Sequence, residues 1–91
     1  MNFPKQGDLV KSLAGHDKNQ FFIVISVKDG FLYLADGDLR RVEKPKKKNL
    51  RHCVLVKENP EIRTSKDIGV ANAEIRKCIK EFLNKEDLQI G

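Results

Sequence analysis

Basic side chains crowd into one short stretch of this chain, and they are the residues whose spacing best suits a chemical role. Between Arg40 and Arg51 stand seven Lys or Arg residues and one acid, Glu43, a local net charge of +6. The whole chain carries +5, so the rest sums to about −1. A concentrated positive patch beside a compact fold is typical of a polyanion site, above all one for nucleic acid. A lysine-rich loop that only aids solubility is the alternative, since charge runs are most often solvated faces.

Patterns for catalysis and metal binding find little support in the sequence. The acids are scattered, and Ser12 has no nucleophile-elbow context. His16 and Asp17 are neighbours in a loop, but their side chains need not face each other. Cys53 and Cys78 lie 25 residues apart without the close ligand spacing of a zinc site, so both are expected to be small buried hydrophobes. We therefore expect a protein that is not an enzyme and uses no metal, cofactor or small-molecule substrate.

Length and composition predict one small domain with an appended element. The chain has 91 residues, of which 40% are apolar and 34% are charged, and its pI is near 9.4. No apolar run approaches the roughly 20 residues that cross a bilayer. The first residues show no apolar segment typical of a secretory signal. These features predict a soluble, cytoplasmic, monomeric protein that favours anionic partners and does not enter membranes.

Two β-rich runs, 21–28 and 31–35, flank Asp29-Gly30 and give the clearest local pattern. Asp-Gly between such runs favours a two-residue type I′ turn, because both central residues must take a positive φ. The expected register has four opposed pairs: Lys28–Phe31, Val27–Leu32, Ser26–Tyr33 and Ile25–Leu34. One face would carry the core residues: Ile23, Ile25, Val27, Leu32 and Leu34. The other face is too apolar to stay fully wet; it would carry Phe22, Val24, Ser26, Phe31 and Tyr33.

Three further strands are expected around this hairpin. The first covers 7–13 and is followed by a polar loop, 14–20, in which Gly15 suits a positive φ. Another covers 39–42, with a bulge at Arg40-Arg41 that turns Leu39 and Val42 inward. Pro45 would end that ladder and leave 46–49 as an exposed loop, before a last strand over 50–57. Five short strands with tight turns predict a small, partly open barrel.

The C-terminal third changes to a helical period. Its apolar stripe consists of Ile75, Cys78, Ile79, Phe82 and Leu83. Asn72 is the expected N-cap, with Glu74 in the first turn of a helix of about 12–14 residues. Such a helix is marginal alone, so we expect it to dock on the barrel face that carries Phe22 and Tyr33. The predicted organisation is a barrel over 1–60 and a helical extension over 61–91.

Two segments resemble a known RNA-associated pattern. Residues 7–18 with 22–25 look like a KOW motif, an alternating strand–loop–strand unit with a glycine in the loop. Residues 35–50, Ala-Asp-Gly-Asp-Leu-Arg-Arg-Val-Glu-Lys-Pro-Lys-Lys-Lys-Asn-Leu, resemble the matching stretch of the L-fourteen-e family of large-subunit ribosomal proteins and its small bacterial KOW-domain relatives. The resemblance spans about residues 5 to 55.

This resemblance implies a five-stranded SH3-like barrel, with the helix docked on it, that binds ribosomal RNA. In that family the loop after the first strand and the basic segment after the fourth strand approach the RNA. The implied contacts are Gly15, His16, Asp17, Lys18, Arg40, Arg41, Lys44, Lys46, Lys47 and Lys48, and the charged window adds Arg51. His16 stands where the family pattern has an arginine, so a neutral side chain there would weaken the loop as a phosphate contact.

A protein-interaction module is the alternative function, because small barrels also bind peptides and a fold does not settle function. In that case the lysine run would engage an acidic protein, and Tyr33 and Phe31 would line a peptide groove. In the RNA-binding case these aromatics either stack a base or pack under the helix. Aromatics covered by the helix would therefore favour RNA binding through the basic loop, whereas aromatics open in a groove would favour a peptide partner.

Overall fold

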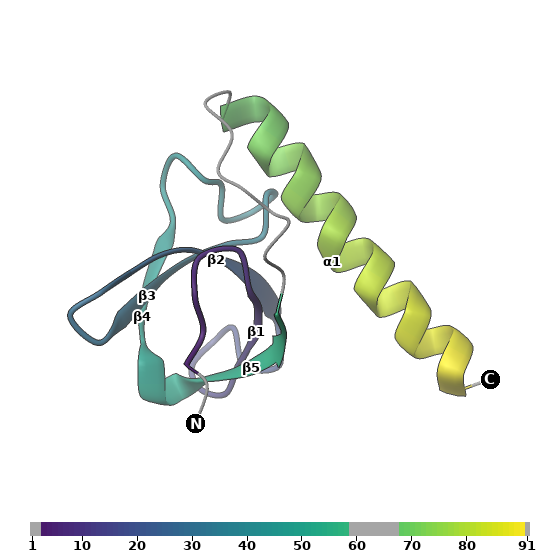
Figure 1. Ribbon diagram of the computed structural model, residues 1–91, viewed down its shortest axis with the longest axis horizontal. Coiled ribbons are helices and arrows are strands. Elements are labelled where there is room, and N and C mark those ends of the chain that lie inside the picture. The colour runs from purple at the N-terminus through teal and green to yellow at the C-terminus, as the bar shows by residue number, and fades with distance from the viewer. Residues whose placement is uncertain (1–2, 59–67, 91) are drawn as a thin grey trace.

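The computed structural model describes residues 3–58 and 68–90, with helix side chains described over 71–85. Its five strands form one antiparallel sheet in the order β4-β3-β2-β1-β5, and a helix runs along one side of it (Figure 1). The elements are β1 (Leu9–Ser12), β2 (Phe21–Lys28), β3 (Phe31–Ala35), β4 (Lys46–Asn49), the 3-10 turn η1 (Leu50–His52), β5 (Cys53–Lys57) and α1 (Ile68–Ile90). The predicted class, mainly β with a C-terminal helix, is confirmed. In the ladders β4 and β5 are the two edges, joined by η1, and closure into a barrel stays a prediction.

The β2–β3 hairpin turns at Asp29-Gly30 as expected. Both residues have a positive φ, 53° and 80°, which the type I′ turn requires. The first three predicted pairs are confirmed, but the fourth is wrong: Leu34 lies opposite Val24, and the register shifts between Val24 and Ser26. A bulge at Ile25 therefore exchanges the two faces of the N-terminal half of β2.

This exchange decides which residues form the core. One buried cluster comprises Val10, Phe22, Val24, Leu32 and Leu34. A second cluster comprises Leu9, Ile23, Ala35 and Ile75, with Phe21, Ile25 and the helix side chains packed against it. Ile23 is therefore buried as predicted, but Ile23 and Ile25 lie in the second cluster and not on the face of Leu32 and Leu34. Val27 is 47% exposed, so its predicted place in the core is wrong.

The segment after β3 forms a loop where a strand was expected. The Asp36 carboxylate accepts hydrogen bonds from the backbone N–H groups of Asp38 and Arg40, at 2.9 and 2.8 Å, so the chain turns on itself there. Leu39 is 85% exposed, and the predicted bulged strand over 39–42 is wrong. The lysine run forms β4 instead, paired with β3 in the register Phe31–Asn49, Leu32–Lys48, Tyr33–Lys47 and Leu34–Lys46.

The helix is longer than expected and starts earlier. It has 23 residues and begins at Ile68, so Asn72 lies inside it and the predicted N-cap is wrong. Most of the predicted stripe is confirmed: Ile75, Cys78, Ile79 and Phe82 join the cluster on β2. Leu83 is 40% exposed. The receiving surface was predicted wrongly, because α1 packs on Phe21, Ile23 and Ile25, whereas Phe22 lies in the other cluster.

The predicted boundary between barrel and extension, near residue 60, lies outside the described residues. Within the described part of the chain, no helix is long and apolar enough to span a membrane.

Candidate nucleic-acid interface

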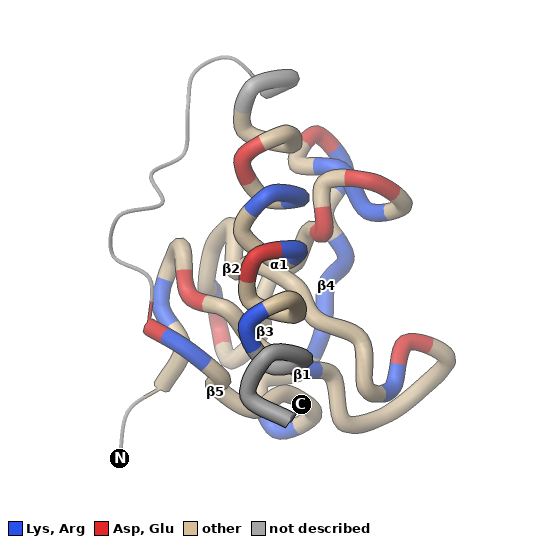
Figure 2. Tube along the Cα trace, turned by 90° about the vertical axis from the view of Figure 1, so that its right-hand side faces the viewer, with Lys and Arg blue, Asp and Glu red and all other residues tan. Residues whose placement is uncertain are grey.

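The lysines of β4 point alternately to two sides of the sheet, and Figure 2 shows them as a continuous blue segment. Lys46 and Lys48 lie opposite the core residues Leu34 and Leu32 and reach Asp17. Lys47 lies on the other side, with its ammonium 4.3 Å from the ring centre of Phe31. One run of like charges therefore has two different environments.

Asp17 is a buried carboxylate that ties the loop after β1 to β4. Its Oδ2 lies 2.6 Å from Nζ of Lys46 and its Oδ1 lies 2.8 Å from Nζ of Lys48. Ser12 Oγ donates to Oδ1 at 2.7 Å, and Lys48 also donates to the carbonyl of Ala14 at 2.7 Å. Burial alone would raise the pKa of Asp17, but the hydrogen bonds from Lys46, Lys48 and Ser12 outweigh it and hold that pKa well below its usual range.

The loop after β1 folds around this carboxylate. Gly15 has φ +85°, as predicted, and its carbonyl accepts from the Lys18 N–H at 3.2 Å. The exposed side chains of the loop include His16 and Lys18. His16, Arg40 and Lys46 line one small hollow of about 190 Å³. Side chains from the two segments that the sequence singled out therefore meet there.

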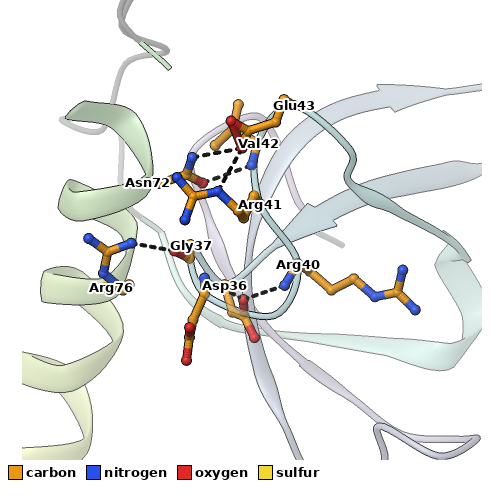
Figure 3. A network of polar contacts seen from close by, with 9 residues as sticks. Asp36, Gly37, Arg40, Arg41, Val42, Glu43, Asn72 and Arg76 are labelled. Atoms are coloured by element: carbon orange, nitrogen blue, oxygen red, sulfur yellow. Dashed lines mark hydrogen bonds and ion pairs between the residues drawn. The ribbon is translucent and has the colours of Figure 1, made fainter. Parts of the chain in front are cut away.

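The loop over 36–44 is held to the helix by a polar network, drawn in Figure 3. Asn72, fully buried, accepts from the Val42 N–H and donates to Glu43 Oε1, both at 2.8 Å. Arg41 Nε lies 3.2 Å from the same Glu43 oxygen. The bond from Asn72, with Arg41 nearby, lowers the pKa of Glu43. Arg76 donates to the Gly37 carbonyl from the next turn of α1.

Replacing Asn72 tests this attachment. Asn72→Ala leaves the Val42 N–H without its acceptor and opens a small void, so we expect a loss of about 1–3 kcal/mol of unfolding free energy. Urea titration followed by circular dichroism measures it. The matched control is Asn84→Ala, the same change at an exposed site on the same helix, which should cost less than about 0.5 kcal/mol. Equal losses in the two variants would contradict the assigned role of Asn72.

The candidate contact residues therefore fall into two groups. Exposed residues are His16, Lys18, Arg40, Arg41, Lys44, Lys47 and Arg51, and Gly15 is exposed as well. Arg40 extends away from the network in Figure 3, whereas Arg41 turns back to Glu43. Lys46 and Lys48 keep only 26% and 9% of their side chains exposed and are paired with Asp17. That pairing was not predicted from the sequence; the signal available was the alternation of lysines in a strand opposite a loop acid.

Phe31 and Tyr33 are half-buried, and neither belongs to the cluster under the helix. Alternation along β3 puts both on the same face as Ala35, which that cluster includes. Of the two alternatives for these aromatics, packing under the helix is therefore not observed for the described helix side chains, 71–85.

Metal binding and cysteine chemistry find little support in the described part of the chain. Among the described side chains, 3–58 and 71–85, there is no group of three or more His, Cys, Asp or Glu that could hold a metal ion. Cys53 and Cys78 form no disulfide and are half-buried, each packed on one of the two core clusters. Burial raises the pKa of the Cys53 thiol, which keeps the less reactive protonated form. No protein-family model matches this chain, and no curated protein shows a significant match.

Proposed function

We propose that this protein binds structured RNA, in particular ribosomal RNA, through β4 and the loop that precedes it. In this proposal the curled sheet is a small SH3-like barrel of the KOW type, and the cations act by neutralising phosphates. The resemblance over residues 5–55 and the local charge of the 40–51 window both support it. An enzymatic role is not part of the proposal.

The single observation that carries this proposal is the set of exposed cations around β4. Arg40, Lys44, Lys47 and Arg51 are exposed within one stretch of twelve residues, 40–51. Arg41 forms an ion pair with Glu43, but 49% of its side chain remains exposed. Exposed Lys and Arg side chains give up little when they exchange water and counterions for phosphates. Binding should therefore be electrostatic, with RNA shape more important than base identity outside any unpaired segment.

Lys46 and Lys48 take a supporting role in this proposal. Their charges already face the Asp17 carboxylate, so they position β4 and the loop after β1, and they add little free charge. A variant that replaced them would confuse loss of folding with loss of binding. The test below therefore leaves both lysines in place.

A salt series with a charge-matched pair of variants tests the proposal. We expect Arg40→Gln, Lys44→Gln and Lys47→Gln, combined, to flatten the slope of log affinity against log salt by about two to three, since each neutralised phosphate contributes roughly 0.7–0.9. Fluorescence anisotropy of a labelled ribosomal RNA hairpin between about 50 and 200 mM salt measures the slope. Single- and double-stranded DNA of similar length should bind more weakly than the hairpin.

The control variant combines Lys5→Gln, Lys57→Gln and Lys77→Gln, which removes the same charge from exposed sites outside the 40–51 window. Its slope should match that of the unmodified protein. If both triple variants flatten the slope equally, binding depends on net charge and not on this surface. If RNA binds no better than DNA and neither variant has an effect, the basic window is a solvated face.

A peptide or acidic protein partner is the second candidate function. The observation that favours it is that Phe31 and Tyr33 are only half-buried and lie outside the cluster under the helix. An acidic peptide such as oligoglutamate would then compete with RNA for Lys47.

A further inference from the structure

The outer face of β3 beyond the end of the helix packing forms a small grid of side chains. Directly opposed residues of antiparallel strands point to the same side. One row across β2, β3 and β4 therefore reads Lys28, Phe31 and Asn49, and the next reads Ser26, Tyr33 and Lys47. Two aromatic rings occupy the middle strand, with polar or cationic side chains on both flanks.

The described side chains of α1, 71–85, pack beside this grid and not on its two rings. The cluster under α1 includes Ala35 of β3 but neither Tyr33 nor Phe31. Ser26, Lys28 and Lys47 are exposed, and the two rings are half-buried. The Phe31 ring contacts the Lys47 ammonium at 4.3 Å, a cation–π contact that is weak at exposed sites. The rings are thus held in place by the sheet while part of their surface remains accessible.

We propose that this face, named here the β3 platform (Phe31 and Tyr33, flanked by Lys28 and Lys47), stacks an unpaired base of the bound RNA. The inference rests on the proposed function and adds its substrate class: RNA with a bulged or looped-out nucleotide. Aromatic rings match the planar base, and the flanking ammonium groups match the phosphates on either side of it. Bases inside a duplex stay stacked on their neighbours and offer no free face.

Lys47 connects the platform to the charged surface. When a base covers Phe31, the Lys47 ammonium leaves the ring and its flexible stem allows it to reach a phosphate of the same strand. Charge favours RNA over an apolar peptide, because Lys28 and Lys47 flank the rings and Arg51 follows β4 by two residues. One acidic residue, Asp29, lies in the β2–β3 turn next to Lys28 and adds a negative charge at that end of the platform.

Two RNA hairpins that differ by one unpaired adenosine test the platform. Tyr33 is the sole tyrosine and the chain has no tryptophan, so tyrosine-labelled protein reports on this face alone by NMR. We expect the bulged hairpin to shift the Tyr33 ring signals upfield and to bind roughly tenfold more tightly (about 1.4 kcal/mol) than the fully paired one. Phe31→Leu should lose that preference and leave the affinity for the paired hairpin unchanged.

Phe3→Leu, the same substitution at an exposed site outside the platform, is the matched control and should change neither affinity. Tyr33→Leu provides a second platform variant if Phe31→Leu unfolds. Equal binding of both hairpins with silent Tyr33 signals would overturn the platform while leaving the salt-dependent RNA binding intact. If neither hairpin binds, the proposed function fails and the platform with it. Movement of the Tyr33 ring on adding oligoglutamate, with none on adding RNA, would also overturn it in favour of a peptide site.

Discussion

Gly37→Ala is expected to destabilise the protein by about 3 kcal/mol or more. Gly37 has φ +79°, where an alanine costs roughly 1–2 kcal/mol. A Cβ there would also overlap the backbone carbonyl of Asn72 and lie 2.9 Å from Cγ of Arg76. Since the helix backbone cannot yield as a flexible side chain would, overpacking adds a further 1–3 kcal/mol. Urea unfolding followed by circular dichroism gives the difference in free energy.

Gly30→Ala separates the two contributions in this prediction. Gly30 has nearly the same φ, +80°, but a Cβ there would meet nothing within 4 Å. Its alanine variant should lose only the conformational term, about 1–2 kcal/mol. Similar losses for both glycines would show that the close approach of loop and helix contributes nothing.

Asp17→Asn is expected to cost about 3 kcal/mol or more at neutral pH. The variant keeps the size of the side chain but removes the charge that faces Lys46 and the almost buried Lys48. Breaking a buried ion pair by removing one partner typically costs 3–5 kcal/mol, because the other charge stays desolvated without compensation. Thermal and urea unfolding measure the loss. Asp38→Asn, which removes an exposed acid, should change stability by less than about 0.5 kcal/mol.

The same carboxylate makes stability depend on acid pH. The pKa of Asp17 is lower in the folded protein than the value near 3.9 of an unfolded aspartate. Its contribution is therefore fully present above about pH 5 and is lost as the pH falls below about 4. Urea midpoints measured from neutral pH downward should fall more steeply in the unmodified protein than in Asp17→Asn. Parallel curves for the two proteins would mean that this carboxylate is not strongly paired.

Short-range sequence patterns correctly predicted the turn and the helix, whose conformations depend mainly on neighbouring residues. Asp29-Gly30 specifies its turn through backbone conformation alone, and the stripe from Ile75 to Phe82 follows from the helical period. The faces of β2 were not predictable in this way, because a single bulge at Ile25 reverses the alternation. The strand formed by Lys46–Asn49 was also missed, since lysines have low strand propensity and only tertiary pairing with β3 and Asp17 accounts for it.

The sequence predicted which residues form the charged surface better than it predicted what each of them does there. Exposure of Arg40, Lys44, Lys47 and Arg51 agrees with a charged surface. Which lysines are free depends on the direction of each side chain in β4, and that direction follows from a strand that the sequence did not reveal. Asn72 shows the same limit: its type suits a cap, but its buried amide instead fastens the 36–44 loop to the helix.

The most direct test of the proposed RNA surface is a map of the backbone amide signals by NMR as an RNA hairpin is added to the unmodified protein. We expect the signals of Arg40, Lys44, Lys47 and Arg51 to move first. Those of the exposed helix positions Lys77 and Lys85 should stay in place. Changes that fade together as salt is raised would fit contacts with phosphates. No change at β4, or changes confined to the helix, would contradict the account.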